Sequence, residues 1–572
     1  MLRWLSMSGH GIGCCRCLAL ALLAWAGANA PAVGTCFAQS SPATSVPHGP
    51  LFVPVDSWIY PALMRLAALG YISDQAAGMR PWTREECIRQ LVEAERIRDR
   101  ASEYPQTANS EEASRLIRAL RQELARDRGA TDFVEIESVY TRYLGVAGTP
   151  LIDGYNFGQT VIDDYGRPSA KGANGIAGFS VAASAGRISF YARTEYWLAP
   201  PFASPAASLQ SVAPQIEPVL FGAPTGVNRV DAVEAYAGIQ LGRWSVTVGK
   251  QDLWWGPGVS SAMSLTNDAQ PFYSFRVTTA SPLVLPGALR KLGSFRVDLI
   301  GGELSGHLLP PRPLLNGQKL TWIVGRGLEL GFTRWSLFGG EGTRAFTVGT
   351  VLRSFTANSA TYGDAVDPGD RKSGFDFLWR LPLPGRPVTL YADLYADDEP
   401  SPLSGPQRSG FAPGIYFARI PGLARWDLRV EAPSTRMANS DQGGKFLYWN
   451  NVYHDANTNS GYLLGSWVGR DGRGLSIEST WWRSARSKLQ FAYRQNRIGP
   501  AFLPGGGTQD DASVTATVNP KPDWTVRGSV QYERYLIPVL GGLHRDLAAS
   551  LELNYAPHWR SLQNRGELPH LQ

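Results

Sequence analysis

From about residue 146 onward, apolar and polar residues alternate along most of the chain. In the segments 388–395, 524–533 and 547–555, apolar or aromatic residues take every second position, and mostly polar or charged residues take the others. This period of two is typical of β-strands with one apolar and one polar face. One such strand would also suit a soluble sandwich, but the pattern recurs many times. It therefore predicts a mainly β fold.

The repeated strands predict a closed transmembrane β-barrel over residues 146–560, followed by a C-terminal tail at 561–572. Backbone groups in lipid have no water to bond to, so a β-structure that spans a membrane must close on itself. At ~23 residues per strand and turn, this region gives about 18 antiparallel strands. Aromatic residues near the expected strand ends fit the girdles of such barrels. They are Tyr196, Trp197, Trp244, Trp379, Trp524, Tyr555 and Trp559.

The preceding region, residues 51–145, has little glycine and many charges. Apolar residues at helical spacing predict a first helix that ends near Gly70. A second helix is expected after Thr83, with Glu86 completing a capping box, and a third from near Ser110. We expect these three helices to form a small periplasmic domain that plugs the barrel or contacts the assembly machinery. Alternatively, the region resembles half of a surface-layer homology motif, which would make it a wall-binding module.

Residues 1–38 predict a secretory signal peptide. Arg3 and Arg16 precede a short apolar stretch, and small residues allow cleavage after Ala30 or Ala38. The apolar stretch is too short to cross a membrane as a helix. Residues 39–50 are rich in Ser, Pro and Thr, which is typical of a linker.

Composition narrows the possible functions. Charged residues make up 18% of the chain and the formal net charge is +6, without a dense basic stripe. This pattern indicates neither a disordered chain nor a nucleic-acid-binding surface. Of the five cysteines, Cys36 and Cys87 are the two that follow Ala30. We therefore expect no disulfide scaffold, no metal site and no cofactor.

The most distinctive stretch is GKQDLWWGPG at 249–258, followed by LTNDAQPF at 265–272. Its two adjacent tryptophans precede a turn forced by Gly-Pro-Gly. Aromatic faces beside Asn, Asp and Arg side chains suit sugars, which stack on rings and need hydrogen bonds to their hydroxyls. The expected polysaccharide-binding residues are Trp254, Trp255, Asn267, Asp268 and Arg276.

Consecutive strand residues point to opposite faces, so one of the two tryptophans is expected to face the ligand, and Trp255 is the preferred one. The alternative is that the pair belongs to an aromatic girdle and a barrel turn. Binding would then lie in the loops around residues 200–228 and 436–460.

Motifs for catalysis are weak. Ser305 and His307 form a loose pair without a residue to orient the histidine. The 455–459 segment resembles the start of a calcium loop but lacks the bidentate carboxylate, which favours an Asn-rich turn. We expect no catalytic residues. The alternatives are a porin-like transport channel and, less favoured, an outer-membrane hydrolase.

Several segments resemble the capsule assembly Wzi family of outer-membrane proteins. They are PVDSWIYPALMRLAALGYI at 54–72, TREE at 83–86, the Trp-Trp-Gly-Pro-Gly segment, GRGLELGFTR at 325–334 and GYLLGSWVGRD at 461–471. The resemblance implies an outer-membrane barrel with a periplasmic helical bundle. It also implies a lectin that binds and displays capsular or other surface polysaccharide without catalysis. The expected partners are this polysaccharide, outer-membrane lipid and the capsule export machinery, with no nucleic acid.

Overall fold

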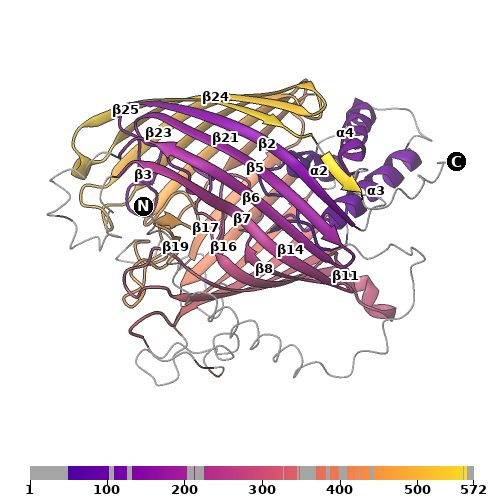
Figure 1. Cartoon of the computed structure of the whole chain (residues 1–572), viewed down its shortest axis with the longest axis horizontal. Coiled ribbons are helices and arrows are strands. Elements are labelled where there is room, and N and C mark those ends of the chain that lie inside the picture. The colour runs from indigo at the N-terminus through magenta and orange to yellow at the C-terminus, as the bar shows by residue number, and fades with distance from the viewer. Residues whose placement is uncertain are drawn as a thin grey trace, which may run out of the picture.

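The body of the molecule is a closed antiparallel β-barrel with a group of helices at one end (Figure 1). The computed structural model describes residues 49–101, 108–124, 132–202, 225–325, 327–343, 369–381, 387–397, 409–423, 425–437, 443–557 and 559–562, with the isolated residues 212, 347 and 349. The predicted signal peptide, almost all of the linker and most of the tail lie outside these residues.

The predicted mainly β fold of about 18 strands is confirmed. The wall strands, in chain order, are β2 (Asp132–Ala147), β5 (Gly172–Ala185), β6 (Ile188–Ala199), β7 (Val227–Leu241), β8 (Trp244–Lys250), β10 (Tyr273–Thr279), β12 (Ser294–Glu303), β13 (Leu314–Val324), β14 (Leu328–Phe338), β15 (Asp370–Arg380), β16 (Val388–Asp397), β17 (Ser409–Phe417), β18 (Trp426–Glu431), β21 (Gly472–Trp482), β22 (Lys488–Ile498), β23 (Gly507–Lys521), β24 (Trp524–Leu536) and β25 (Leu543–Tyr555).

Shorter elements complete the described secondary structure. The short strands are β1 (Met79–Arg80), β3 (Ile152–Asp153), β4 (Gly158–Gln159), β9 (Trp254–Trp255), β11 (Leu283–Val284), β19 (Thr458–Asn459), β20 (Tyr462–Leu463) and β26 (Trp559–Leu562). The short 3-10 helices are η2 (Gly287–Leu292) and η4 (Pro538–Leu540).

The barrel closes where β25 pairs with β2, and β26 extends this pairing along the first half of β2. The strand β2 starts at Asp132, so the barrel begins before the boundary predicted at residue 146. The first seven residues of β2, DFVEIES, are rich in acidic residues. In composition this segment therefore resembles the charged helical region before it, and the boundary was predicted too late.

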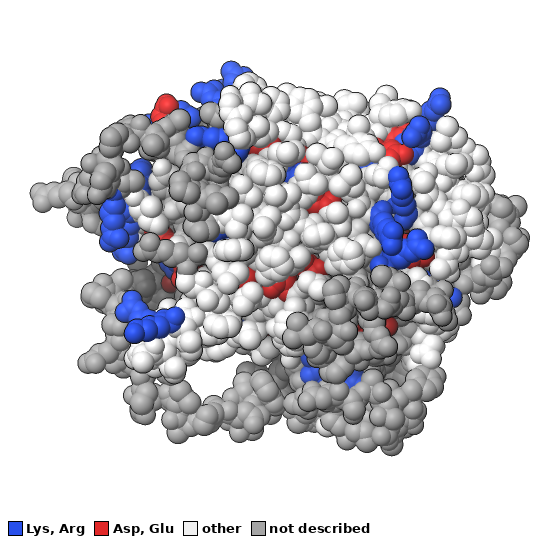
Figure 2. All heavy atoms as spheres, turned by 180° about the vertical axis from the view of Figure 1, so that it is seen from behind, with Lys and Arg blue, Asp and Glu red and all other residues white. Residues whose placement is uncertain are grey.

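The outer wall carries the apolar residues of the alternating pattern. On β25, Leu547, Leu551 and Leu553 are 48%, 50% and 39% exposed, while Asp546 and Ala548 are buried on the inner side. In the view of Figure 2, Lys and Arg gather mainly toward the two ends of this wall. An apolar band between charged ends is the surface that a membrane-spanning barrel needs.

Most of the predicted girdle residues also face outward. Tyr196, Trp244, Trp379 and Trp524 are between 37% and 44% exposed. The prediction for Trp197 was wrong, because its side chain is 2% exposed and donates a hydrogen bond to Glu195 at 2.7 Å. Tyr196 and Trp197 are consecutive in β6, so one must point outward and the other inward. The side chain of Trp559 lies outside the described residues.

The three predicted helices are present as α2 (Ile59–Ala68), α3 (Arg84–Ala101) and α4 (Ala108–Leu124). The chain leaves α2 at Gly70, whose φ of +90° favours glycine. The Thr83 hydroxyl accepts a hydrogen bond from the backbone N–H of Glu86 at 3.1 Å, as the capping box predicts. No helix in the described part of the chain is both long and apolar enough to cross a membrane.

A buried ionic network fixes the helices to the barrel. Arg65 of α2 is fully buried and lies 2.6 Å from Glu112 of α4 and 3.2 Å from Asp427 of β18. Trp482 of β21 donates its indole N–H to the same aspartate at 2.7 Å, and Arg419 lies 3.2 Å from Glu112. These contacts join two helices to two wall strands at one end of the barrel.

The two barrel ends differ in their connections. The end that carries the helices, here the helix end, has tight turns such as 186–187, 242–243 and 522–523. The opposite end, here the loop end, has long connections that include 148–171, 251–272 and 432–471. The position of a ligand-binding site depends on where these long loops lie.

Candidate polysaccharide-binding site

The connection 251–272 folds into the barrel lumen. The backbone N–H groups of Val259 and Ser260 donate to the Glu431 carboxylate of β18, both at 2.9 Å. The backbone N–H of Met263 donates to Asp393 of β16 at 2.8 Å. This connection leaves β8 and returns to β10, yet it bonds to inward-facing side chains of other wall strands. We call it the inner loop.

The predicted Trp-Trp-Gly-Pro-Gly motif is the part of the inner loop that meets the helical region. Trp254 and Trp255 form β9, which pairs with β1 at Met79 and Arg80. Gly256 has φ of +150°, and an added Cβ would lie 2.7 Å from the Asp393 carboxylate and 2.8 Å from Ala262. The motif therefore needs glycine at 256 because the wall and the loop itself leave no room for a side chain.

The two tryptophans point into different protein surroundings. Trp254 is 3% exposed, donates its indole N–H to the carbonyl of Gly258 at 3.0 Å and stacks against Arg80. Trp255 is 1% exposed and packs in an apolar cluster with Phe272 and other loop and wall residues. Both indole rings are thus covered by the protein.

Trp255 and Arg276 meet at one carboxylate. Asp298 of β12 accepts the Trp255 indole N–H at 3.2 Å and two guanidinium bonds from Arg276 at 2.8 Å each. The Arg276 guanidinium also lies 4.8 Å from the ring centre of Phe52, a residue of the N-terminal segment. The two predicted residues thus lie close together, and the carboxylate that they share is inside the protein.

Asn267 and Asp268 join the inner loop to the connection 148–171. The backbone N–H groups of Tyr165 and Gly166 donate to the carbonyls of Asn267 and Asp268 at 2.6 and 2.8 Å. The backbone N–H of Asp163 donates to the Asp268 carboxylate at 2.5 Å, and the Asn267 amide donates to the Tyr165 hydroxyl at 3.1 Å. These contacts hold two loops together within the lumen.

Burial shifts the acidity of this junction. Burial raises the pKa of Asp268 to about 7, although the hydrogen bond from the Asp163 backbone opposes the shift. Burial, reinforced by the nearby Asp268 charge, also raises the pKa of Asp163. Such a pair is more stable with at least one carboxyl protonated.

All five sequence-predicted binding residues are therefore buried, with exposures between 1% and 4%. The structure divides them into two groups, Trp255 with Arg276 and Asn267 with Asp268, while Trp254 contacts the helical region. The prediction that they bind polysaccharide stays a prediction, and in the structure their contacts are with the lumen-filling segments.

A different aromatic cluster lies in the loop-end connection 432–471. Phe446 and Trp449 have ring centres 5.1 Å apart, and Trp449 and His454 have ring centres 5.6 Å apart. The Lys445 ammonium lies 4.8 Å from the Phe446 ring, and the Arg470 guanidinium lies 5.9 Å from the Trp449 ring. We call these five residues the loop-end cluster.

Four of the five residues of the loop-end cluster are accessible, whereas Arg470 is buried like the predicted motif. Lys445, Phe446, Trp449 and His454 are partly exposed, and Asn451 and Val452 beside them are exposed. The sequence signal was the run KFLYWNN at 445–451, which places a cation, rings and amides in one loop. The loop around 436–460 was the alternative location for binding. Most of the other one, 200–228, lies outside the described residues.

Neither weak catalytic motif acquires a catalytic geometry. His307 is buried, and its Nε2 lies 2.8 Å from the carbonyl oxygen of Thr458, so this nitrogen is engaged away from Ser305. The Asp455 carboxylate accepts backbone N–H groups of Leu308 and Leu309 at 2.7 and 3.3 Å. Among the described residues, no three His, Cys, Asp or Glu side chains are grouped as metal ligands would be.

The barrel region matches a known protein family. The family model described as "Capsule assembly protein Wzi" matches residues 144–543. The chain belongs to this family. The match covers most of the barrel of this Wzi-family chain, including the inner loop and the loop-end cluster.

Two relatives give further context for the Wzi-family chain. A Klebsiella pneumoniae protein described as an uncharacterized 55.8 kDa protein in cps region is 28% identical over 220 residues, covering 36% of this chain and 41% of that protein. The match thus spans about two fifths of the relative's length. The solved structure of Wzi from Escherichia coli, described as a carbohydrate-binding β-barrel involved in group 1 capsule assembly, has a TM-score of 0.65 at 18% identity. It covers 89% of this chain and 100% of that one, and shows that the fold is shared.

Proposed function

We propose that this protein binds surface polysaccharide at the loop end of a plugged outer-membrane barrel and does no chemistry. Membership of the capsule assembly family and the carbohydrate binding of the E. coli barrel support the ligand class. The observation that carries the location is the loop-end cluster, because its three rings and the Lys445 ammonium are partly exposed, with Arg470 buried beside them.

The chemistry of the loop-end cluster suits an acidic or neutral sugar chain. The rings of Phe446 and Trp449 can stack on the C–H faces of sugars, because an aromatic ring offers a flat apolar face. The Lys445 ammonium and the amides of Asn450 and Asn451 can bond to carboxylates and hydroxyls. Such a surface binds a polymer by repeated weak contacts and needs no nucleophile or acid.

The orientation follows from the lengths of the connections. Outer-membrane barrels keep short turns on the periplasmic side and long loops outside. By this rule the helix end faces the periplasm and the loop end faces the exterior. The helical region then belongs to the barrel as its periplasmic plug, a role supported by the Arg65 network and by β1, which reaches β9.

A transport channel is the weaker candidate. Inside the lumen, the backbone N–H of Val55 in the N-terminal segment donates to Asp252 of the inner loop at 2.7 Å. The inner loop in turn contacts the connection 148–171 through Asp268 and Asp163. Protein atoms thus occupy the path that a solute would take. We expect the purified protein to show little conductance in planar bilayers.

Binding is tested with the purified full-length protein and polysaccharide from the same cells. Trp449→Ala should weaken binding about tenfold or more, since truncating an aromatic residue that anchors a ligand costs about 2 kcal/mol or more at a binding hot spot. Trp379→Ala is the matched control, because that tryptophan is exposed on the outer wall at the helix end. Both variants should keep the mobility shift on boiling that a closed barrel gives.

Two results would contradict the proposal. If Trp449→Ala binds as the unchanged protein does, the loop-end cluster is not the site. If the protein purifies without any affinity for surface polysaccharide, the ligand class is wrong.

A further inference from the structure

An outward-facing row of polar residues crosses four adjacent strands at the loop end. In the strand register Gln495 of β22 lies opposite Asp510 of β23, which lies opposite Arg534 of β24, which lies opposite Arg545 of β25. These residues alternate with buried, lumen-facing neighbours such as Arg494. The four therefore sit on the outside of the wall, next to the rim.

The rows below them change from aromatic to aliphatic. The next outward row toward the barrel middle is Tyr493, Ala512, Tyr532 and Leu547, and the one after it is Phe491, Val514, Val530 and Ala549. Successive rows are two residues, or about 7 Å, apart along the strands. Charged side chains are costly at the membrane midplane but cost little near the interfaces. The gradient therefore locates the polar row at the membrane boundary.

The polar row carries more positive than negative charge. Arg497, two residues beyond Gln495 on β22, is exposed, as are Arg534 and Arg545. Asp510 lies 3.2 Å from Arg534. Among the residues that line this part of the outer wall, it is the one carboxylate that faces outward. Within the described residues no carboxylate lies within ion-pair distance of Arg497 or Arg545. We call Arg497, Arg534 and Arg545 the arginine patch.

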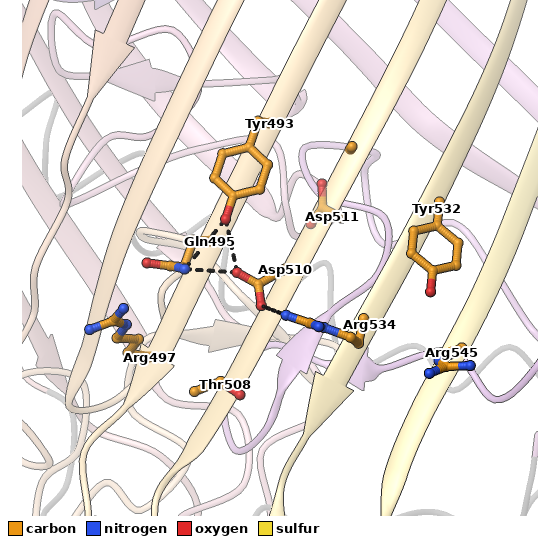
Figure 3. A pocket seen from close by; sticks show the side chains of 10 residues that line it. Tyr493, Gln495, Arg497, Thr508, Asp510, Asp511, Tyr532, Arg534 and Arg545 are labelled. Atoms are coloured by element: carbon orange, nitrogen blue, oxygen red, sulfur yellow. Dashed lines mark hydrogen bonds and ion pairs between the residues drawn. The ribbon is translucent and has the colours of Figure 1, made fainter.

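The arginine patch borders a depression of about 700 Å³. Figure 3 shows Arg497 and Arg545 on either side of the Asp510–Arg534 pair, with Tyr493 above Gln495 and Tyr532 above Arg545 in this view. Tyr493 and Gln495 donate to Asp510 at 2.9 and 2.8 Å, which holds that carboxylate in place. The two flanking guanidinium groups remain available for an anion.

We infer that the arginine patch binds the phosphate groups of a phosphorylated glycolipid in the outer leaflet. Guanidinium groups pair with phosphate through two parallel hydrogen bonds. The sugar would lie over the tyrosine row, and the acyl chains would run along the Phe, Val and Leu rows beneath it. A soluble anion would gain nothing from those apolar rows, whereas a lipid uses both. The inference rests on the proposed orientation, in which the loop end faces outward.

The test measures lipid binding by the full-length protein in neutral detergent, with native mass spectrometry as the readout. The probe is bis-phosphorylated lipid A, and the same lipid without phosphates is the comparison. Arg497→Ser combined with Arg545→Ser should lower affinity for the phosphorylated lipid about tenfold or more, because charge-assisted bonds to phosphate are lost. The matched control is Arg187→Ser with Arg243→Ser, which removes two exposed arginines from helix-end turns.

Three results would overturn the inference. Equal binding of the dephosphorylated lipid would show that phosphate is not recognised, and equal loss in the control would show a general charge effect. If soluble acidic polysaccharide displaces the lipid from the unchanged protein but not from the double variant, the patch binds the polymer instead. Free inorganic phosphate at millimolar concentration should not displace the lipid.

Failure of this inference is separable from failure of the polysaccharide proposal. Trp449→Ala should leave lipid A affinity unchanged, because Trp449 lies in the 432–471 loop and not on β22–β25. The orientation is tested by Arg497→Cys in intact cells. A membrane-impermeant thiol reagent should label it from outside, and labelling only after lysis would overturn the orientation and the lipid assignment together.

Discussion

The guanidinium carbon of Arg80 lies 4.8 Å from the centre of the Trp254 indole ring, and both side chains are buried inside the barrel. Arg80 also donates to the carbonyls of Gly256 and Gly258 at 3.2 and 2.6 Å. This pair joins a segment of the helical region to a loop that enters from the opposite end. The lumen is thus closed by two parts of the chain that hold each other.

Arg80→Ala should loosen this junction. The substitution removes a buried cation–π contact and two hydrogen bonds. The Gly258 carbonyl keeps the Trp254 indole N–H, whereas the Gly256 carbonyl loses its Arg80 donor at a cost of about 1–3 kcal/mol. We expect higher or noisier conductance in planar bilayers, with the heat-dependent mobility shift retained. Arg243→Ala, in an exposed turn, is the control and should behave as the unchanged protein. Equal conductance for all three proteins would mean that the junction does not seal the lumen.

A second prediction concerns the docking of the helices. Asp427→Asn removes the charge that Arg65 meets in the barrel wall. Because Arg65 keeps Glu112, the cost should lie below the ~3–5 kcal/mol of a buried charge left without a partner. We expect α2 and α4 to become sensitive to protease while the barrel stays resistant. Arg115→Ala breaks an exposed pair with Glu111 and should have no such effect. Unchanged protease resistance of the Asp427 variant would show that the helices are held by apolar packing alone.

The start of β2 determines where the helical region can be deleted without damage to the barrel. A deletion that ends at residue 144 would remove most of β2, because that strand starts at Asp132. A deletion of residues 52–124 keeps every wall strand. It should leave a heat-modifiable barrel that conducts, since the lumen would lose both β1 and the segment around Phe52.

A third prediction concerns the lipid-facing wall. Leu551→Arg should cut the folded yield, because an arginine near the middle of the membrane costs about 2–4 kcal/mol. Glu552 is the next residue and points inward, between Arg142 and Arg527 in the register of the neighbouring strands. Glu552→Gln is therefore a better control than Glu552→Arg, which would place three arginines together. Similar yields for Leu551→Arg and Glu552→Gln would mean that β25 does not face lipid.

The wall strands could be predicted from the sequence, but the segments that fill the lumen could not. Alternation on β16, β24 and β25 identifies which side of each strand is apolar, because that side must meet lipid along its whole length. Nothing comparable marks a loop that folds inward. The local sequence around Trp254 and Trp255 is compatible with an exposed platform and with a filled lumen. Their burial depends on contacts with Arg80 and Asp298, which are distant in the sequence.

The loop-end cluster could be predicted from the sequence only in part. Lys445, Phe446 and Trp449 are recognisable as a ligand-binding composition, but Arg470 and His454 join them through the fold of a long connection. The arginine patch could not be predicted either, because Arg497, Arg534 and Arg545 come from three strands and meet only once the register is known.

A fourth prediction concerns the acid dependence of the lumen contacts. The pKa of Asp268 is raised by burial to about 7, so the folded loop junction favours the protonated carboxyl. A group with a raised pKa contributes most below its unfolded value and loses that contribution as pH rises toward the folded value. The junction with residues 163–166 should therefore weaken between about pH 4 and pH 7 and change little above that range.

Hydrogen exchange at the backbone amides of Tyr165 and Gly166 measures this effect. Protection, corrected for the intrinsic exchange rate, should be greater near pH 5 than near pH 7.5. Asp268→Asn keeps a neutral side chain of similar size and should remove the difference. If the variant and the unchanged protein show the same pH dependence, another group, such as Asp163, controls the junction.

The last prediction compares the tryptophan chosen from the sequence with the one found in the structure. Trp255 is 1% exposed and its indole N–H bonds to Asp298, so Trp255→Ala should lower stability by about 3–5 kcal/mol, as truncation of buried aromatic residues does. Trp449 is partly exposed at the loop end but packs against the same apolar cluster, so its truncation should lower stability less than that of Trp255 while releasing polysaccharide into the medium. The temperature at which the heat-dependent mobility shift occurs separates the two effects, and released polymer is measured in the same cultures. Loss of polymer by Trp255→Ala at unchanged stability would instead show that the polysaccharide reaches the lumen and that the site predicted from the sequence binds it.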